Sequence, residues 1–218
     1  MLILFDFDGT LVDVKKKYFA VYSDFVEFHH GTALPIENYW RMKRRNASIE
    51  EILHASNIQN IEPTVFKDYI KNNIEKEKFL RLDMLVPKSL NVLKDISINH
   101  TCYLVSMRRN QKMLLAQTEW LGIKPFFTRV FSPQPFIEQE DASPNTVKSR
   151  LLGEIDLYLP ALIIGDSGMD IKTGKRLAIH TCAVTTGIRE KSFLKQYCPD
   201  FIINSIGDIY GVLDVLNK

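Results

Sequence analysis

Residues 1–14 read MLILFDFDGTLVDV, in which a short apolar run, Leu2–Phe5, leads directly into two aspartates, Asp6 and Asp8. A carboxylate buried without a partner is costly, so either the run ends at an edge open to water or the two acids are used together. Gly9 follows at once and gives the backbone the freedom to bend away from the strand direction. The stretch therefore predicts a buried strand that ends at an acidic edge.

Further short apolar runs recur along the chain, separated by stretches with helical patterns. The expected strands are residues 2–5, 101–105, 129–131, 161–164, 181–184 and 201–203. Runs that are apolar on both faces and alternate with helices are typical of a parallel sheet covered by helices on both sides. The sequence therefore predicts an α/β protein with a three-layer, Rossmann-like core.

The interval from about Lys15 to Asp83 differs, because it carries helical patterns and no convincing strand. The expected organisation is a core of residues 1–14 and 84–218, with a helical domain of residues 15–83 inserted after the first strand. Ligands of open parallel sheets bind beyond the carboxyl ends of the strands, so we expect the functional site there.

The composition is that of an ordinary globular protein, with 45% hydrophobic and 25% charged residues among 218. A net charge of +2 indicates neither a nucleic-acid nor a membrane partner, and no apolar run reaches 18 residues. The three cysteines lack metal-binding spacing, and the N-terminus does not resemble a signal peptide. We therefore expect a soluble, cytoplasmic protein.

Polar residues follow three of the expected strands. Asp6 follows the first, Ser106 follows the run 101–105, and Asp166 and Asp170 lie in the stretch GDSGMD after the run 161–164. Neighbouring strands lie roughly 4.8 Å apart, and the clustered carboxylates, Asp8 included, would repel one another without a cation. A few hard oxygen ligands describe a magnesium site, so Mg²⁺ is expected.

Each of these pieces also has a purely structural interpretation. An Asp-x-Asp-Gly stretch is common where a strand enters a turn, and Gly-Asp-Ser-x-x-Asp can simply cap a helix. Ser106 alone carries almost no information. Their shared placement after apolar runs favours a common site.

Residues 5–13, 105–106, 164–170 and 184–189 closely resemble motifs of the haloacid dehalogenase superfamily, whose members are mostly magnesium-dependent phosphatases. The helical insert lies where this family carries a helical cap of the phosphoglycolate-phosphatase type. The resemblance implies that Asp6 attacks phosphorus to form an aspartyl-phosphate and that Asp8 acts as acid and then base. It also implies that Ser106 binds the transferring phosphoryl group, with Thr10 supporting Asp8 or the phosphate.

The same resemblance implies a ligand set for Mg²⁺. Its members are Asp6, the main-chain carbonyl of Asp8, Asp166 and, directly or as support, Asp170. These residue types suit the chemistry, because a carboxylate attacks a phosphate dianion only when nearby positive charge cancels their repulsion.

The lysine that would pair with the phosphoryl group departs from the common pattern of the family. Many relatives carry it directly before a proline, where this chain has Ser143 and Pro144. We favour Lys148, about one turn into the helix expected there, over Lys172 and Lys175. A solvated lysine on a helix face is the structural alternative.

The expected function is hydrolysis of a small phosphorylated metabolite. A phosphomutase or phosphonate hydrolase on the same core, a 2-haloacid dehalogenase, and a catalytically idle binding protein stay open as alternatives. Basic residues at two places in the sequence give weaker indications of an anionic substrate. The first is the pair Arg108 and Arg109, and the second comprises the runs 15–17 and 41–45. Each could contact an anionic substrate or form a solvated surface.

Overall fold

The computed structural model describes residues 1–133, 148, 152 and 160–217. It divides into two compact units. Residues 1–13 and 85–218 form the first, called the core unit here, and residues 14–84 form the second, called the helical unit.

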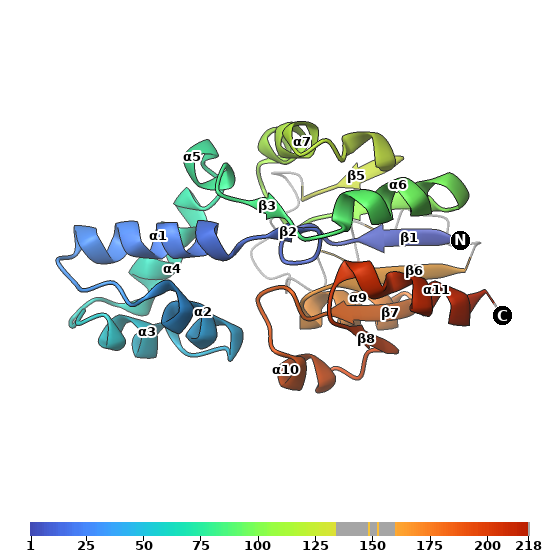
Figure 1. Ribbon diagram of the computed structural model, residues 1–218. Helices are drawn as coiled ribbons and strands as arrows, with labels where there is room; N and C mark the ends of the chain where they lie inside the picture. The colour runs from blue at the N-terminus through green and yellow to red at the C-terminus, as the bar shows by residue number, and fades with distance from the viewer. Residues whose placement is uncertain (134–147, 149–151, 153–159, 218) are drawn as a thin grey trace. The chain divides into compact units, whose positions relative to one another are not determined.

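The core unit contains a six-stranded parallel sheet in the described part of the chain (Figure 1). Its order is β5-β4-β1-β6-β7-β8. The strands are β1 (Leu2–Phe5), β4 (Thr101–Val105), β5 (Arg129–Phe131), β6 (Ala161–Gly165), β7 (His180–Val184) and β8 (Phe201–Ile203). The predicted α/β class and all the predicted strands are confirmed.

Strand β1 lies at the centre of this sheet, between β4 and β6, and all four of its residues are buried. Phe5 is level with Leu104 of β4 on one side and with Ile164 of β6 on the other. The three strands run in one direction, so their carboxyl ends meet at one edge. At such a point in a parallel sheet a ligand crevice is expected.

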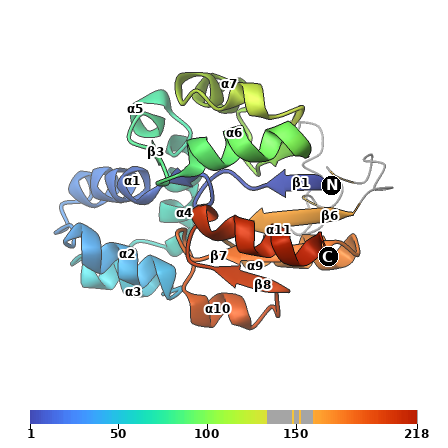
Figure 2. The ribbon, with the colours of Figure 1, turned by 45° about the vertical axis from the view of Figure 1, so that its right-hand side comes forward.

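Helices of the core unit flank the sheet. Helices α6 and α11 lie side by side over one face in both views (Figures 1 and 2), while α9 packs against β6 and β7. Their bounds are α6 (Ser89–Asn99), α7 (Gln111–Trp120), α9 (Gly168–Arg176), α10 (Lys191–Lys195) and α11 (Ile209–Leu216), with short 3-10 turns η1 (Lys124–Phe126) and η3 (Ile206–Asp208). The helix expected after Ser143 and Pro144 lies outside the described residues, apart from Lys148 and Leu152.

The helical unit has an aromatic core. The rings of Tyr22 and Tyr39 stack with centroids 4.1 Å apart, and Phe25 packs on Phe66. The helices are α1 (Lys15–Phe28), α2 (Ile36–Arg44), α3 (Ile49–Ala55), α4 (Pro63–Asn73) and α5 (Glu77–Leu80). Two short strands that the sequence did not reveal, β2 (Val12–Asp13) and β3 (Met84–Leu85), pair where the chain leaves and re-enters the core unit.

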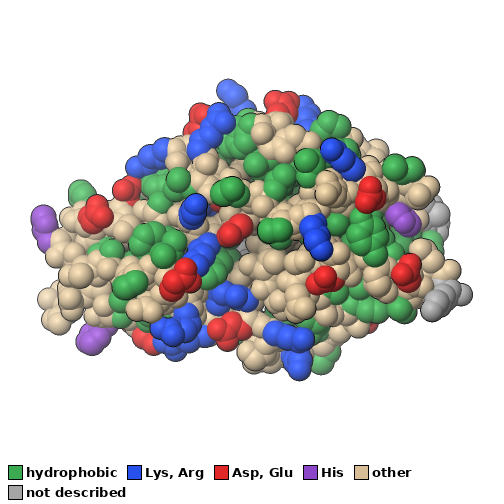
Figure 3. All heavy atoms as spheres, in the orientation of Figure 1, with side chains coloured by type: hydrophobic (Ala, Val, Ile, Leu, Met, Phe, Trp, Pro, Cys, Tyr) green, Lys and Arg blue, Asp and Glu red, His purple; other side chains and the backbone are tan. Residues whose placement is uncertain are grey.

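Charged side chains of both signs are interspersed on the face shown in Figure 3. Several basic residues of the helical unit have acidic or aromatic partners: Lys15 with Glu37, Arg45 with Glu51, and Lys43 over the Tyr18 ring. Among the described helices, none has the length and apolar character needed to cross a membrane.

Candidate active site

Asp6 lies directly beyond β1, at the carboxyl edge of the sheet. Its main-chain N–H donates to the carbonyl of Ile164 at 2.8 Å, which continues the sheet pairing by one residue. Its side chain is 13% exposed, and Nζ of Lys148 donates to Oδ1 at 2.7 Å. This carboxylate is therefore held in place and open on one side.

Three carboxylates converge at this edge. Oxygen atoms of Asp6, Asp166 and Asp170 all lie within 4.8 Å of one another. Asp166 follows β6, and its Oδ2 accepts the main-chain N–H of Ile188 at 2.6 Å. Asp170 lies in the first turn of α9, and its Oδ2 accepts the main-chain N–H and the hydroxyl of Ser167. Asp170 thus caps helix α9 and is also a member of the acidic cluster.

Glycines make room for two of these carboxylates. A methyl group on Gly187 would lie 2.5 Å from Cβ of Asp166, and one on Gly9 would lie 2.7 Å from its Cγ. A methyl group on Gly165 would lie 2.5 Å from Cβ of Asp170. Gly9 also has a φ of +82°, a conformation that other residues avoid. The close backbone approach therefore requires glycine at these positions.

Burial dominates the electrostatics of the cluster. It raises the pKa of Asp6 to about 7, with Lys148 opposing the rise and the charge of Asp170 adding to it. Burial also raises the pKa of Asp166 well above its usual range, helped by the charges of Asp6 and Asp170. Burial lowers the pKa of Lys148, but the two carboxylates beside it outweigh that effect and raise it overall.

Lys148 is the lysine at this site. It is 1% exposed and donates to Asp6 and also to Asp170, at 2.5 Å. Lys172 and Lys175, the competing candidates, are exposed, and Lys172 lies over the ring of Tyr197.

The donor set fits a hard divalent cation. Three clustered carboxylates face one ammonium group, so the cluster carries a net charge of −2 when all of these groups are ionised. Oxygen ligands of this kind and number suit Mg²⁺, and a bound cation of charge two would balance them.

The remaining predicted residues lie on the neighbouring loops. Ser106 follows β4, is 1% exposed, and its Oγ accepts the main-chain N–H of Arg108 at 3.3 Å. The hydroxyl of Thr10 is buried and finds no hydrogen-bond partner in the described part of the chain, so its proposed role stays a prediction. Asp8 is 26% exposed and is not one of the three converging carboxylates.

Sequence reasoning left the role of Arg108 open, and the structure places it at Asp8. The side chain of Arg108 is 5% exposed and donates to both carboxylate oxygens of Asp8, each at 2.7 Å. This ion pair was missed because nothing local in the sequence joins residues one hundred positions apart.

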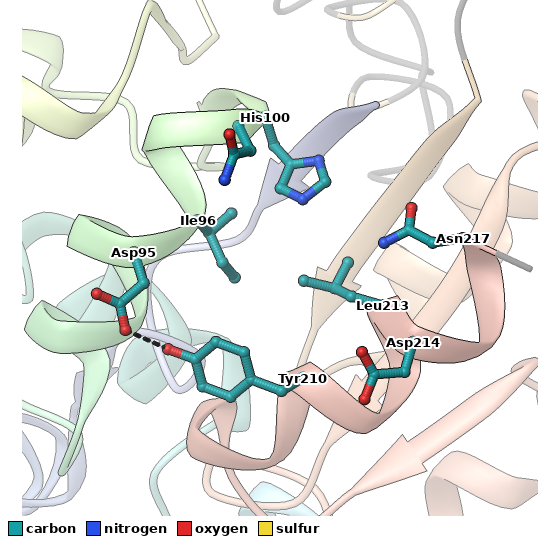
Figure 4. A pocket seen from close by; sticks show the side chains of 8 residues that line it. Asp95, Ile96, His100, Tyr210, Leu213, Asp214 and Asn217 are labelled. Carbon is teal, nitrogen blue, oxygen red and sulfur yellow. Dashed lines mark hydrogen bonds between the residues drawn. The ribbon is translucent and has the colours of Figure 1, made fainter.

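A cavity of about 300 Å³ lies elsewhere in the core unit, lined by residues of α6 and α11 together with His100 and Asn217 (Figure 4). Tyr210 closes one side by donating to Asp95 at 2.7 Å. His100 directly precedes β4, so the cavity is at the edge where the strands begin. It is separate from the acidic cluster.

Three comparisons with known proteins bear on the family and the fold of this chain. The model of the haloacid dehalogenase-like hydrolase family matches residues 3–184. A pyrophosphatase PpaX from Oceanobacillus iheyensis is 26% identical over 97% of this chain and 95% of its own, and a phosphoglycolate phosphatase from Synechococcus elongatus is 20% identical over 99% and 98%. A haloacid dehalogenase-like family hydrolase from Streptococcus pneumoniae has a similar fold, with a TM-score of 0.77 at 20% identity over 97% of both chains.

Proposed function

This chain belongs to the family of haloacid dehalogenase-like hydrolases, and we propose that it is a Mg²⁺-dependent phosphatase acting on a small phosphomonoester through an aspartyl-phosphate. The supporting observation is the surroundings of Asp6. A buried strand presents its carboxylate between a buried lysine and two further carboxylates. A simple turn at a strand end needs none of these groups.

In the proposed reaction Asp6 attacks the phosphorus atom, and the bond from phosphorus to the leaving oxygen breaks. Asp8 gives a proton to that oxygen. Asp8 then takes a proton from the water molecule that attacks the aspartyl-phosphate. An alcohol and inorganic phosphate are released, and the Asp6 carboxylate is restored.

The other groups bind and orient the phosphoryl group. Lys148 pairs with it and Ser106 donates a hydrogen bond, while Asp6, the carbonyl of Asp8 and Asp166 hold Mg²⁺. When bound, Mg²⁺ supplies positive charge that lets a carboxylate approach a phosphate dianion. Asp170 acts as support, because Lys148 and Ser167 already bond its two oxygens.

We also propose that the helical unit is the cap that selects the substrate and that the protein acts in the cytoplasm. The three thiols, none of them in a disulfide, are compatible with that compartment. The acidic cluster disfavours a 2-haloacid dehalogenase, which needs no cation. A phosphomutase or phosphonate hydrolase would share the core, and product analysis distinguishes them from a phosphatase.

Release of phosphate from a panel of phosphomonoesters tests the proposal. Phosphoglycolate and pyrophosphate belong in the panel, because relatives carry these names. We expect turnover only with Mg²⁺ and a loss of more than about a thousandfold in Asp6→Asn. Asp68→Asn, which removes an exposed carboxylate of α4, is the matched control and should behave like the wild type. Full activity of Asp6→Asn would exclude the nucleophile, and Mg²⁺ binding without turnover of any ester would favour an idle binding protein.

A further inference from the structure

Arg108 forms a two-point ion pair with Asp8. Nε donates to Oδ2 and Nη2 donates to Oδ1, both at 2.7 Å. Paired, parallel hydrogen bonds of this kind fix the plane and the direction of a carboxylate, which a lysine at the same place cannot do.

The guanidinium group is itself held from several directions. Its Nη1 donates to Oε1 of Gln117, a fully buried residue of α7. The guanidinium carbon lies 5.1 Å from the centroid of the Phe7 ring. The main-chain N–H of Arg108 donates to Ser106. A buried arginine bonded on all three of its nitrogens is neither a solvated surface residue nor a free anion-binding group.

We propose that Arg108 is a positioning residue that fixes the side chain of Asp8 for proton transfer, an inference that rests on the proposed phosphatase function. A general acid works only within hydrogen-bond reach of the reacting oxygen, so its rotamer must be fixed. Each carboxylate oxygen has two lone-pair positions, and the pair with Arg108 uses one on each. The pair therefore holds the plane of the Asp8 carboxyl group through one position on each oxygen.

The pair also links two parts of the proposed site. The loop after β4 carries Ser106, which would bind the phosphoryl group, and two residues later Arg108, which orients Asp8. One short segment thus sets the position of the acid relative to the phosphate site. While Asp8 is ionised, Arg108 cancels its charge; once Asp8 carries the proton that it donates, the pair has one positive charge, which attracts an incoming anion.

Kinetics of Arg108→Gln and Arg108→Lys on the best ester of the panel, with saturating Mg²⁺, test this inference. In Arg108→Gln we expect kcat to fall by about 10- to 100-fold, which is less than the roughly 100- to 10,000-fold contributed by general acid–base catalysis, because Asp8 remains but is no longer held in place. KM should stay within about threefold of the wild type. Arg108→Lys keeps the positive charge but cannot donate the two parallel hydrogen bonds of the guanidinium group. Its kcat should therefore lie between those of the wild type and Arg108→Gln. Arg176→Gln, which removes an exposed arginine of α9, is the control.

Mg²⁺ affinity separates positioning from general structural damage. The side-chain bonds of Arg108 to Asp8 and Gln117 involve residues outside the three clustered carboxylates, so calorimetry should show affinities within about threefold of the wild type in both variants. An unchanged kcat, an effect confined to KM, or loss of Mg²⁺ binding in both variants would each overturn the proposal. An inactive wild type would instead refute the phosphatase function itself.

Discussion

Gly187→Ala tests whether the position of Asp166 matters. The new methyl group would lie 2.5 Å from Cβ of Asp166 and closer still to its carboxylate, whereas carbon atoms in contact are about 3.5–4.0 Å apart. Gly187 does not have a positive φ, so alanine fits the backbone there. The substitution therefore acts through one steric conflict, and Asp166 has to move by about 1 Å.

The size of the effect follows from this displacement. Overpacking of this kind costs about 1–3 kcal/mol of stability. Displacing a group at a metal site weakens metal binding by about 10- to 100-fold, and a misplacement of about 1 Å in a catalytic site can cost about 100-fold in rate. Calorimetry of Mg²⁺ binding, thermal unfolding and phosphate release measure the three quantities.

Gly211→Ala is the matched control, because this glycine lies inside α11 with nothing within 4 Å of an added methyl group. Alanine there should leave Mg²⁺ binding unchanged and stabilise the helix by up to about 1 kcal/mol. If Gly187→Ala binds Mg²⁺ as tightly as the wild type and turns over at the same rate, the reasoning about Asp166 fails.

Three further changes probe other contacts. The metal-free protein should lose stability as the pH rises from 3.8 to about 7, because folded Asp6 holds its proton more tightly than unfolded Asp6. Mg²⁺ needs this group ionised, so calorimetry should find it bound about tenfold more tightly at pH 8 than at pH 6; an affinity equal at both values contradicts this. Lys17→Met should lower the free energy of unfolding, measured by denaturant titration, by about 3–5 kcal/mol, because it leaves Asp83 buried without its ammonium partner. In the double variant Lys17→Met, Asp83→Asn, part of this free energy should be recovered. Lys148→Met should reduce kcat/KM by more than about 100-fold in the phosphate-release assay, and a loss below tenfold would argue against its contact with the phosphoryl group.

The sheet could be predicted from the sequence because its strands are apolar on both faces. A sheet with two apolar faces has to be covered by helices on both sides. The pattern identifies the strands without any knowledge of their neighbours in the sheet. Placing Asp6, Ser106 and Asp166 at one edge needed only the parallel direction of the strands. The order β4-β1-β6, which puts the three residues on adjacent strands, comes from the structure alone. Strands β2 and β3 are two residues each, too short to produce a pattern.

The ion pairs Arg108–Asp8 and Lys17–Asp83 could not be predicted from the sequence. Arg108 and Arg109 are neighbours of the same type, and only the folded loop turns Arg108 toward Asp8. Lys17 belongs to a run of three lysines for which the sequence left contact with an anionic substrate and a solvated surface open, yet it is 2% exposed and bonded to Asp83 at 2.8 Å. In both cases the partner is far away in sequence, and the pair forms only when packing excludes water from it.

Charge balance connects the two halves of the site. The Asp8–Arg108 pair is neutral by itself, whereas the ionised Asp6–Asp166–Asp170 cluster keeps an excess of two negative charges after Lys148 is counted. At a pH where all three carboxylates are ionised, an approaching phosphate dianion is therefore repelled by the cluster alone, and a bound divalent cation cancels that repulsion. Cation and phosphate should each increase the affinity of the other by the same factor, because coupling between two sites is reciprocal. Burial strengthens this coupling, since charges removed from water are poorly screened. The same burial that raises the pKa of Asp6 thus makes phosphate binding depend on the cation.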